Sequence, residues 1–105
     1  MKSEPPKAYK RFVEQYPKIG EAWGLLAEAS QEGPLDAKTC RLIKLAMAIA
    51  AQKEGAVHSS TRKSMDIGVT REELEQVVSL APSVIGLSST VAAHCWVLDV
   101  LDKQQ

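Results

Sequence analysis

The stretch from Asp36 to Gly68, DAKTCRLIKLAMAIAAQKEGAVHSSTRKSMDIG, decides how this chain folds. Near its start lie ten residues, LIKLAMAIAA from Leu42 to Ala51, in which Lys44 is the single charge. A helix that is apolar on nearly all sides has no ordinary solvent face. We therefore expect a helix that is central in the fold and is also buried against another copy of the chain.

Local signals place the ends of this helix and of the one after it. Asp36 is a good N-cap, because its carboxylate can accept a backbone N–H of the first turn. Gly55 interrupts the apolar pattern, so we expect the next helix to run from about Ala56 to Ile67. Gly68 then offers a residue that takes the left-handed conformation at a helix end.

The next helix has the clearest start in the chain. Thr70-Arg71-Glu72-Glu73 is a capping box, in which the Thr70 hydroxyl and the Glu73 carboxylate each accept the backbone N–H of the other residue. This helix is expected to end or kink at Pro82. A last helix is expected from about Ser88 to Lys103.

Two helices precede the central stretch, at about 6–16 and 18–31, with Pro17 between them and Gly33-Pro34 after them. Apolar residues recur at helical spacing in both, and no segment shows the alternation of a strand. The sequence thus predicts an all-α fold of about six helices in a single domain, 1–105, with N-terminal helices in 1–34. Trp23 and Trp96 are expected in the core or at an interface.

The composition argues against several classes of partner. Thirteen basic and thirteen acidic residues cancel, so no net field favours nucleic acid or an anionic membrane. The longest apolar run, Leu45 to Ala51, is far shorter than the roughly 20 residues of a membrane span, and the first residues show no apolar signal segment. We expect a soluble, cytoplasmic protein that binds neither nucleic acid nor membrane.

The cysteines and the remaining motifs imply no cofactor and no metal. Cys40 and Cys95 lie far apart without a C-x-x-C pair, so we expect two buried, apolar-like thiols and neither a disulfide nor a zinc site. His94 is expected to be a packed histidine of the last helix. No phosphate loop, Ser-His-Asp order or H-E-x-x-H motif is present.

A set of short motifs lies at fixed distances between residue 35 and about residue 101. They are Leu35-Asp36 followed by Lys38-Thr39 and Leu42-Ile43, the Ala-rich helix to Ala51, Gly68-Val69-Thr70 with Glu72-Glu73-Leu74, and the Gly86 turn. In these features the chain resembles the carboxymuconolactone decarboxylase family, which includes the alkylhydroperoxidase D-like proteins. The resemblance implies an all-helical fold that assembles into homo-trimers or homo-hexamers, with the functional pocket close to a subunit contact.

In the peroxidase branch of that family, the motif looks like a glutamate followed, twelve positions later, by C-x-x-C-x-x-x-H. A helix N-terminus favours the thiolate that attacks peroxide, and the second cysteine resolves the oxidised one. In this chain the glutamate position is Arg41, the cysteine positions are Lys53 and Ala56, and the histidine position is Ser60. A dithiol peroxidase mechanism is therefore excluded at this site. The pattern of the decarboxylase branch also looks like one with a histidine at the position of Ser60, so its chemistry does not carry over to this chain either.

His58 is the candidate catalytic residue that remains. Two residues along a helix is a rotation of about 200°, so we expect His58 to point away from the face shared by Ala56 and Ser60. It is either a histidine in a helix or subunit contact, or an acid–base residue whose ordinary pKa suits proton transfer.

Arg41, Lys53 and Ser60 are the candidate substrate-binding residues, with Arg62 as a further cation for a small carboxylated molecule. The alternative is that these cations are solvated and pair with Glu54 or Asp66.

Two functions follow from these residues. One is a family protein without the dithiol residues, which acts as a non-catalytic oligomer or binds a small molecule. The other is a cofactor-free lyase or decarboxylase-type enzyme for a small carboxylated substrate, using His58 with Arg41 or Lys53. The two differ in whether positions 41, 53, 58 and 60 converge on one open cavity.

Overall fold

The computed structural model describes residues 5–103 of the chain, and these contain helices and no strand. The all-α prediction is therefore confirmed. Six helices have nine residues or more, as expected, and a single turn, α6, is added because Pro82 begins a new turn after α5 ends. The helices are α1 Lys7–Gln15, α2 Pro17–Ala29, α3 Ala37–Ala50, α4 Glu54–Asp66, α5 Arg71–Ser79, α6 Pro82–Ile85 and α7 Leu87–Lys103.

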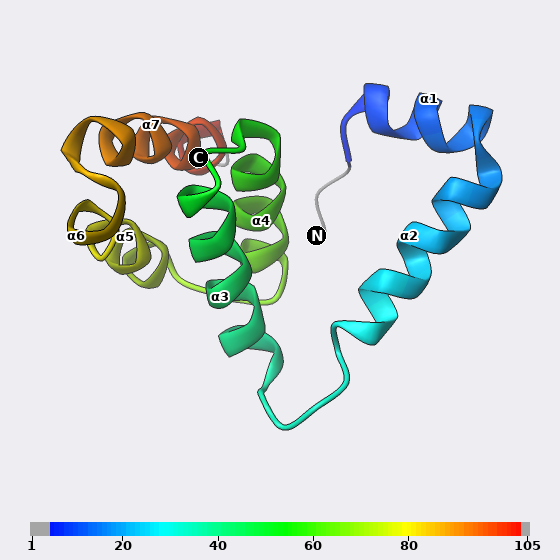
Figure 1. Cartoon of the computed structure of the whole chain (residues 1–105), viewed down its shortest axis with the longest axis horizontal. Helices are drawn as coiled ribbons and strands as arrows, with labels where there is room; N and C mark the ends of the chain where they lie inside the picture. The colour runs from blue at the N-terminus through cyan, green and yellow to red at the C-terminus, as the bar shows by residue number, and fades with distance from the viewer. Residues whose placement is uncertain (1–4, 104–105) are drawn as a thin grey trace.

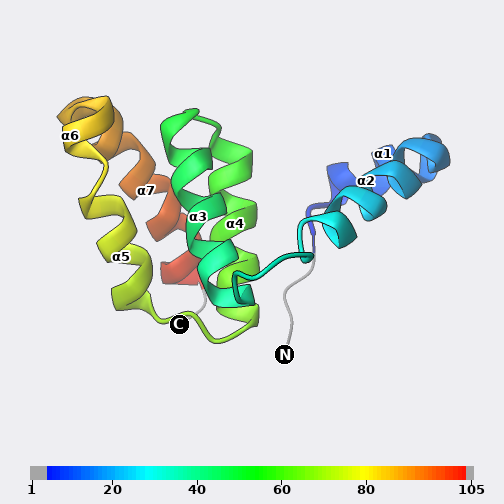
Figure 2. The same ribbon diagram turned by 60° about the horizontal axis from the view of Figure 1, so that its bottom comes forward.

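The helices form two groups (Figure 1). Helices α3 to α7 pack on one another in a bundle, which we call the core, while α1 and α2 pack on each other. We call α1 and α2 the arm. Figure 2 shows from a second side that the arm stands apart from the bundle and is joined to it by the segment 30–36.

The core contains α3, the helix that the sequence predicted to be central, together with four others. Helix α3 packs against both α4 and α5, and α7 packs against α4, α5 and α6. Leu45, Ile49, Val57, Leu74 and Val97 are almost completely buried where these helices meet. Helix α3 is therefore buried on one side, at Leu45, Ala48 and Ile49, and exposed on the side that carries Ile43 and Met47. Its burial against another copy stays a prediction.

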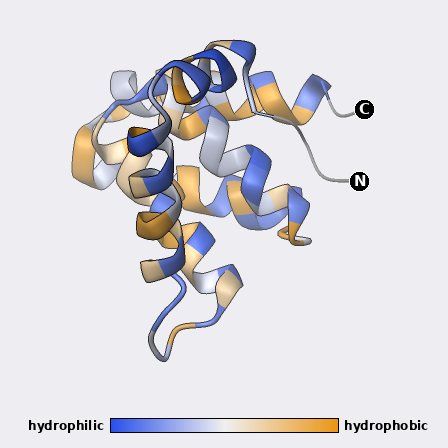
Figure 3. Ribbon diagram, turned by 90° about the vertical axis from the view of Figure 1, so that its right-hand side faces the viewer, coloured by the Kyte–Doolittle hydropathy of each residue, from blue (hydrophilic) through white to orange (hydrophobic). Residues whose placement is uncertain are grey.

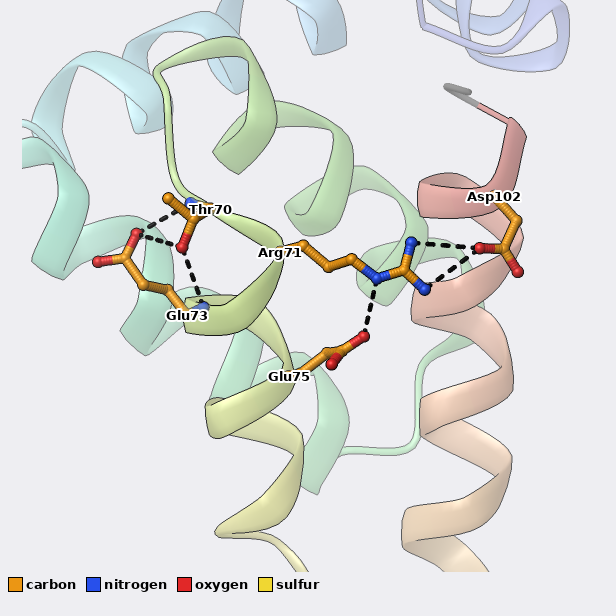
Figure 4. Close-up of polar contacts among 5 residues, drawn as sticks. All are labelled: Thr70, Arg71, Glu73, Glu75 and Asp102. Atoms are coloured by element: carbon orange, nitrogen blue, oxygen red, sulfur yellow. Dashed lines mark hydrogen bonds and ion pairs between the residues drawn. The ribbon is translucent and has the colours of Figure 1, made fainter.

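Both predicted helix caps are present. The Asp36 carboxylate accepts the Thr39 N–H at 2.7 Å, which begins α3. In the capping box of α5, the Thr70 N–H donates to Glu73 Oε1 at 2.9 Å and the Glu73 N–H donates to the Thr70 hydroxyl at 3.2 Å (Figure 4). Arg71, beside the box, reaches the Asp102 carboxylate of α7 at 3.4 Å and so ties the start of α5 to α7.

The break between α3 and α4 is not at Gly55, as the sequence predicted, but at Gln52. Gln52 adopts a positive φ of 56°, a conformation uncommon for a residue other than glycine. Its side-chain amide donates to the Ile49 carbonyl at 2.8 Å and to the Ser89 carbonyl at 3.4 Å, which stabilises the turn. Gly55 consequently lies inside the first turn of α4.

The arm buries none of its side chains. Pro17 ends α1, as expected, and is itself the first residue of α2, where its fixed φ and missing N–H are tolerated. Trp23 is 54% exposed and so is not part of the core of this chain, whereas Trp96 packs, partly buried, against it. The arm therefore has an apolar face that this copy of the chain leaves uncovered.

None of the described helices combines the length and the apolar character that crossing a membrane requires.

Candidate functional site

A cleft of about 860 Å³ separates the arm from the α3 and α4 side of the core. The arm contributes an apolar, largely aromatic wall that includes Tyr9, Phe12 and Trp23. The opposite wall comes from α3 and from the length of α4 between Gly55 and Asp66. Figure 3 views the molecule from the arm side, where hydrophobic and hydrophilic turns alternate along the helices.

The core wall of the cleft is rich in cations. Arg41 and Lys44 lie one turn apart on α3, and Arg62 and Lys63 follow each other on α4. We call these four residues the cationic wall. One carboxylate, Asp66, also lines the cleft. The Lys44 ammonium donates to the Ser30 hydroxyl at 2.8 Å, so the end of the arm is tied to this wall.

Two residues of the cationic wall are held at an energetic cost in the free protein. Desolvation lowers the pKa of Arg41, although the neighbouring Cys40 opposes this effect. Desolvation also lowers the pKa of Lys63, and the charges of Arg41, Arg62 and Lys44 add to it. Both effects disfavour the cationic form. An anion bound at this wall would offset them.

Three of the four candidate residues come together in this cleft. Arg41, His58 and Ser60 all line it, as does Ala56. Lys53 does not line the cleft: it is the exposed N-cap residue of α4. The positions at which the resemblance placed a glutamate, the second cysteine and a histidine therefore share one cavity, and the position of the first cysteine lies outside it.

His58 borders the same cleft as Ala56 and Ser60, so the expected direction of its side chain, away from those two residues, does not keep it out of the cleft. The cleft is wide enough to receive side chains from more than one side of α4. Ser60 is nearly buried, while the His58 side chain is 29% exposed and its Nε2 lies 3.0 Å from Asp99 Oδ2 of α7. His58 therefore makes the helix contact that a packed histidine would make, through Asp99, and it also borders the cleft, where an acid–base residue would have to lie.

Sequence reasoning missed three residues of the site. Asp99, Lys44 and Lys63 gain their positions only through the packing of α3, α4 and α7, and no motif marks them. Lys44 was visible in the sequence as the single charge of an apolar helix segment, which was the one available signal.

Glu54, His58 and Asp99 each place one ligand atom within 4.8 Å of the others. They are the one such group of potential metal ligands in residues 5–103. Glu54 and Asp99 are exposed, and the contact between His58 and Asp99 already accounts for the histidine. We therefore assign no metal to this group.

The two cysteines lie outside the cleft. Cys40 is partly buried, with its Sγ 3.7 Å from the Leu35 carbonyl oxygen, but Cys95 is exposed on α7. The prediction that both thiols are buried is therefore wrong for Cys95, which occupies the outer side of the last helix while Ala93 and Val97 face the core. His94 is partly buried on the same helix.

Comparison with known proteins finds one matching family and a similar solved structure. A sequence model of the Carboxymuconolactone decarboxylase family matches residues 17–97. The crystal structure of an apo carboxymuconolactone decarboxylase family protein from Legionella pneumophila is similar to this chain, with a TM-score of 0.77 and 28% sequence identity. The similarity covers 91% of this chain and 86% of that one. No curated protein sequence matches the chain significantly.

Proposed function

The chain belongs to the carboxymuconolactone decarboxylase family, and we propose that it binds a small carboxylated molecule in the cleft between arm and core, without dithiol peroxidase chemistry. The observation that carries this proposal is the opposition of the cationic wall to the aromatic wall of the arm across one open cavity. A molecule with a carboxylate at one end and an apolar body at the other matches both walls.

The chemistry of the two walls supports this class of ligand. Arginine presents paired N–H donors that fit a carboxylate, and hydrogen bonds of this kind are stronger than those between neutral groups. Partial desolvation of Arg41 and Lys63 lowers their pKa and disfavours their charged forms in the free protein, and the charge of an incoming anion would offset this cost. Tyr9, Phe12 and Trp23 offer rings that can cover the apolar body.

Titration calorimetry with benzoate tests the proposal, because benzoate combines one carboxylate with one apolar ring. Benzamide has the same shape without the charge and is the matched control ligand. We expect heat of binding with benzoate alone, and weaker binding as salt is added, because salt screens charges. Equal binding of the two ligands, or of neither, would contradict the proposal.

A pair of variants locates the binding. Arg41→Gln removes one charge from the cationic wall, and Lys53→Gln removes one charge from a residue outside the cleft. A hydrogen bond to a charged group contributes about 1.5–3 kcal/mol, so Arg41→Gln should weaken benzoate binding roughly 10-fold to 100-fold. Lys53→Gln should change it less than about twofold, and equal losses would mean that only overall charge matters.

The second candidate function is that of a cofactor-free lyase or isomerase acting on such a molecule, with His58 as the acid–base residue. The 3.0 Å contact with Asp99 favours it, because a carboxylate at one ring nitrogen fixes the tautomer and orients the other nitrogen. Arg41 would hold the carboxylate of the substrate in the same cleft.

Proton exchange distinguishes this enzyme from a binding protein. Small keto acids are incubated with the protein in heavy water, and deuterium at the carbon next to the carbonyl is followed by NMR. We expect incorporation above the buffer rate with the wild type and its loss in His58→Gln. Exchange at the buffer rate with the wild type would leave binding as the function.

We further propose that the protein works as a homo-oligomer, a trimer or a hexamer. The support for this is the resemblance of the chain to its family and the uncovered apolar face of the arm. A mass of one chain in solution at micromolar concentration would contradict it.

A further inference from the structure

We propose that Ser30, which lies outside the cleft, is a positioning residue of the anion site. It holds the Lys44 ammonium at the cationic wall, so that a bound anion also fixes the arm. This role depends on the proposed binding of a carboxylated molecule, on which Ser30 acts only through the lysine.

Ser30 is the C-cap residue of α2, where the arm ends and the segment 30–36 begins. Its hydroxyl donates to the Ala27 carbonyl at 2.8 Å and accepts from the Lys44 ammonium at the same distance. A serine hydroxyl has one proton, so the bond to Ala27 uses that proton and leaves the lone pairs of the oxygen for Lys44. The hydroxyl is thus already set as an acceptor for a cation.

The helix of Lys44 itself offers this side chain no acidic partner. The positions one turn away on α3 are Cys40, Arg41, Met47 and Ala48, none of which is a carboxylate. The C-terminus of α2, by contrast, is the negative end of a helix dipole and favours a nearby cation. The place of the half-buried ammonium is therefore set by the end of the arm and not by α3 alone.

The bond to Ser30 leaves Lys44 able to bind a ligand. An ammonium has three N–H donors and this bond uses one of them. The other two can donate to a carboxylate, in hydrogen bonds that are stronger than those between neutral groups. The anion therefore need not displace Ser30, and one lysine can hold the ligand and the arm at the same time.

The connection between arm and core makes this link consequential. The arm helices pack chiefly on each other, and the segment that joins them to α3 contains Gly33, at a φ of 120°, followed by Pro34. A bend at this segment would change the angle between arm and core, and the bond from Lys44 to Ser30 resists it. An anion that fixes the ammonium thereby steadies the aromatic wall on its other side.

Titration calorimetry with benzoate tests the role of the hydroxyl. In Ser30→Ala the lysine must be ordered at the moment of binding, so affinity should fall roughly 2-fold to 10-fold. Ser30→Thr keeps the hydroxyl and should bind like the wild type. Ser79→Ala is the matched control: the Ser79 hydroxyl makes the same bond, to the carbonyl three residues back at the end of α5, but Ser79 does not line the cleft.

A Lys44→Met background separates positioning from a general structural role. Without the ammonium Ser30 has nothing to hold, so adding Ser30→Ala should cost no further affinity. The same loss in both backgrounds would mean that Ser30 acts through the end of α2, which would overturn the inference. Tighter binding in Ser30→Ala would also overturn it, because Ser30 would then compete with the ligand for Lys44.

Cleavage by a glutamate-specific protease reports on the connecting segment, since Glu32 is exposed there. With fragments identified by mass spectrometry, cleavage after Glu32 in the free protein should be faster in Ser30→Ala and in Lys44→Met than in the wild type. It should be no faster in the double variant, because both changes remove the same bond. Saturating benzoate should slow the cleavage of the wild type only, and unchanged cleavage of the benzoate-bound wild type would overturn the inference.

The outcomes for Ser30 and for the ligand are distinguishable. A wild type that binds no benzoate would overturn both the role of Ser30 and the proposed function. Wild-type affinity in Ser30→Ala would overturn only the role of Ser30, because the loss of binding in Arg41→Gln locates the carboxylate independently.

Discussion

Helices α2 and α3 are of similar length and are both rich in alanine and leucine, but they differ in how far their side chains are buried. Helix α3 buries Leu45, Ala48 and Ile49 in the core, whereas α2 buries no side chain and leaves Trp23, Leu25 and Leu26 more than half exposed. The difference teaches that the apolar sequence of a helix predicts that it is buried, but does not tell whether it is buried within its own copy or against another copy. The side of α3 that carries Leu45, Ala48 and Ile49 is covered within one copy, and we infer that the arm is covered by another.

The largest expected effect compares the same substitution in the two regions. Leu74→Ala removes a fully buried side chain of the core and should lower the free energy of unfolding by about 2–5 kcal/mol. Leu26→Ala, on the arm, should change it by less than about 0.5 kcal/mol in protein dilute enough to be dissociated. Urea unfolding at low and high protein concentration measures both values. Equal losses in dilute protein would mean that the arm packs on its own core.

A smaller effect on stability is expected at Glu73, whose carboxylate joins the start of α5 to the start of α3. The ion pair with Lys38, followed by the hydrogen bond from the Thr70 N–H, lowers the pKa of Glu73. Its folded pKa is below its unfolded pKa, so the stabilisation is present above the usual carboxyl pKa and is lost as the pH falls through the folded value.

Glu73→Gln should therefore be less stable than the wild type at neutral pH, and the gap should close on acidification. Unfolding midpoints measured from neutral pH down to about pH 3 would show this. Glu28→Gln, an exposed residue of the arm, is the control and should show no comparable gap at any pH. If the difference in unfolding midpoint between the wild type and Glu73→Gln persists in acid, the effect comes from the changed side-chain contacts and not from the lost charge.

The smallest expected effect lies where the arm faces the core. Desolvation and the charges of Arg41, Arg62 and Lys44 lower the pKa of Lys63 below its unfolded value, so its charge is a cost at neutral pH that disappears as the pH rises through the folded pKa. Lys63→Met should raise stability by up to about 0.5 kcal/mol after solvent screening, or roughly 2–4 °C in melting temperature.

The same variant should weaken benzoate binding, so stability and binding move in opposite directions. Lys53→Met, outside the cleft, should alter neither. A Lys63→Met protein that melts lower than the wild type would show that the cationic wall is already neutralised within the chain.

Local chemistry was readable from the sequence, and contact between distant helices was not. The starts at Asp36 and Thr70 were correctly predicted because a cap is made by residues three positions apart. The break at Gln52 was missed because part of its support, the Ser89 carbonyl, comes from α7, and a glycine three residues later gave the stronger local signal.

The residues of the candidate site also fall into those that the sequence predicted and those whose positions depend on contacts between distant helices. Arg41 and Ser60 were found through the family pattern, and both line the cleft. Lys53 matched the same pattern but lies outside the cleft, because the chain turns before α4 begins. Asp99 could not be predicted at all, since its position beside His58 depends on how α7 crosses α4.

The order of the two regions along the chain also matters while the protein is being made. The arm precedes the core in the sequence, so its apolar face leaves the ribosome before any residue of α3. During that interval the core cannot shield this face, and exposed apolar surface promotes aggregation. If the protein assembles as we propose, neighbouring ribosomes on one messenger would shorten this exposure, because each new arm would emerge close to a completed copy.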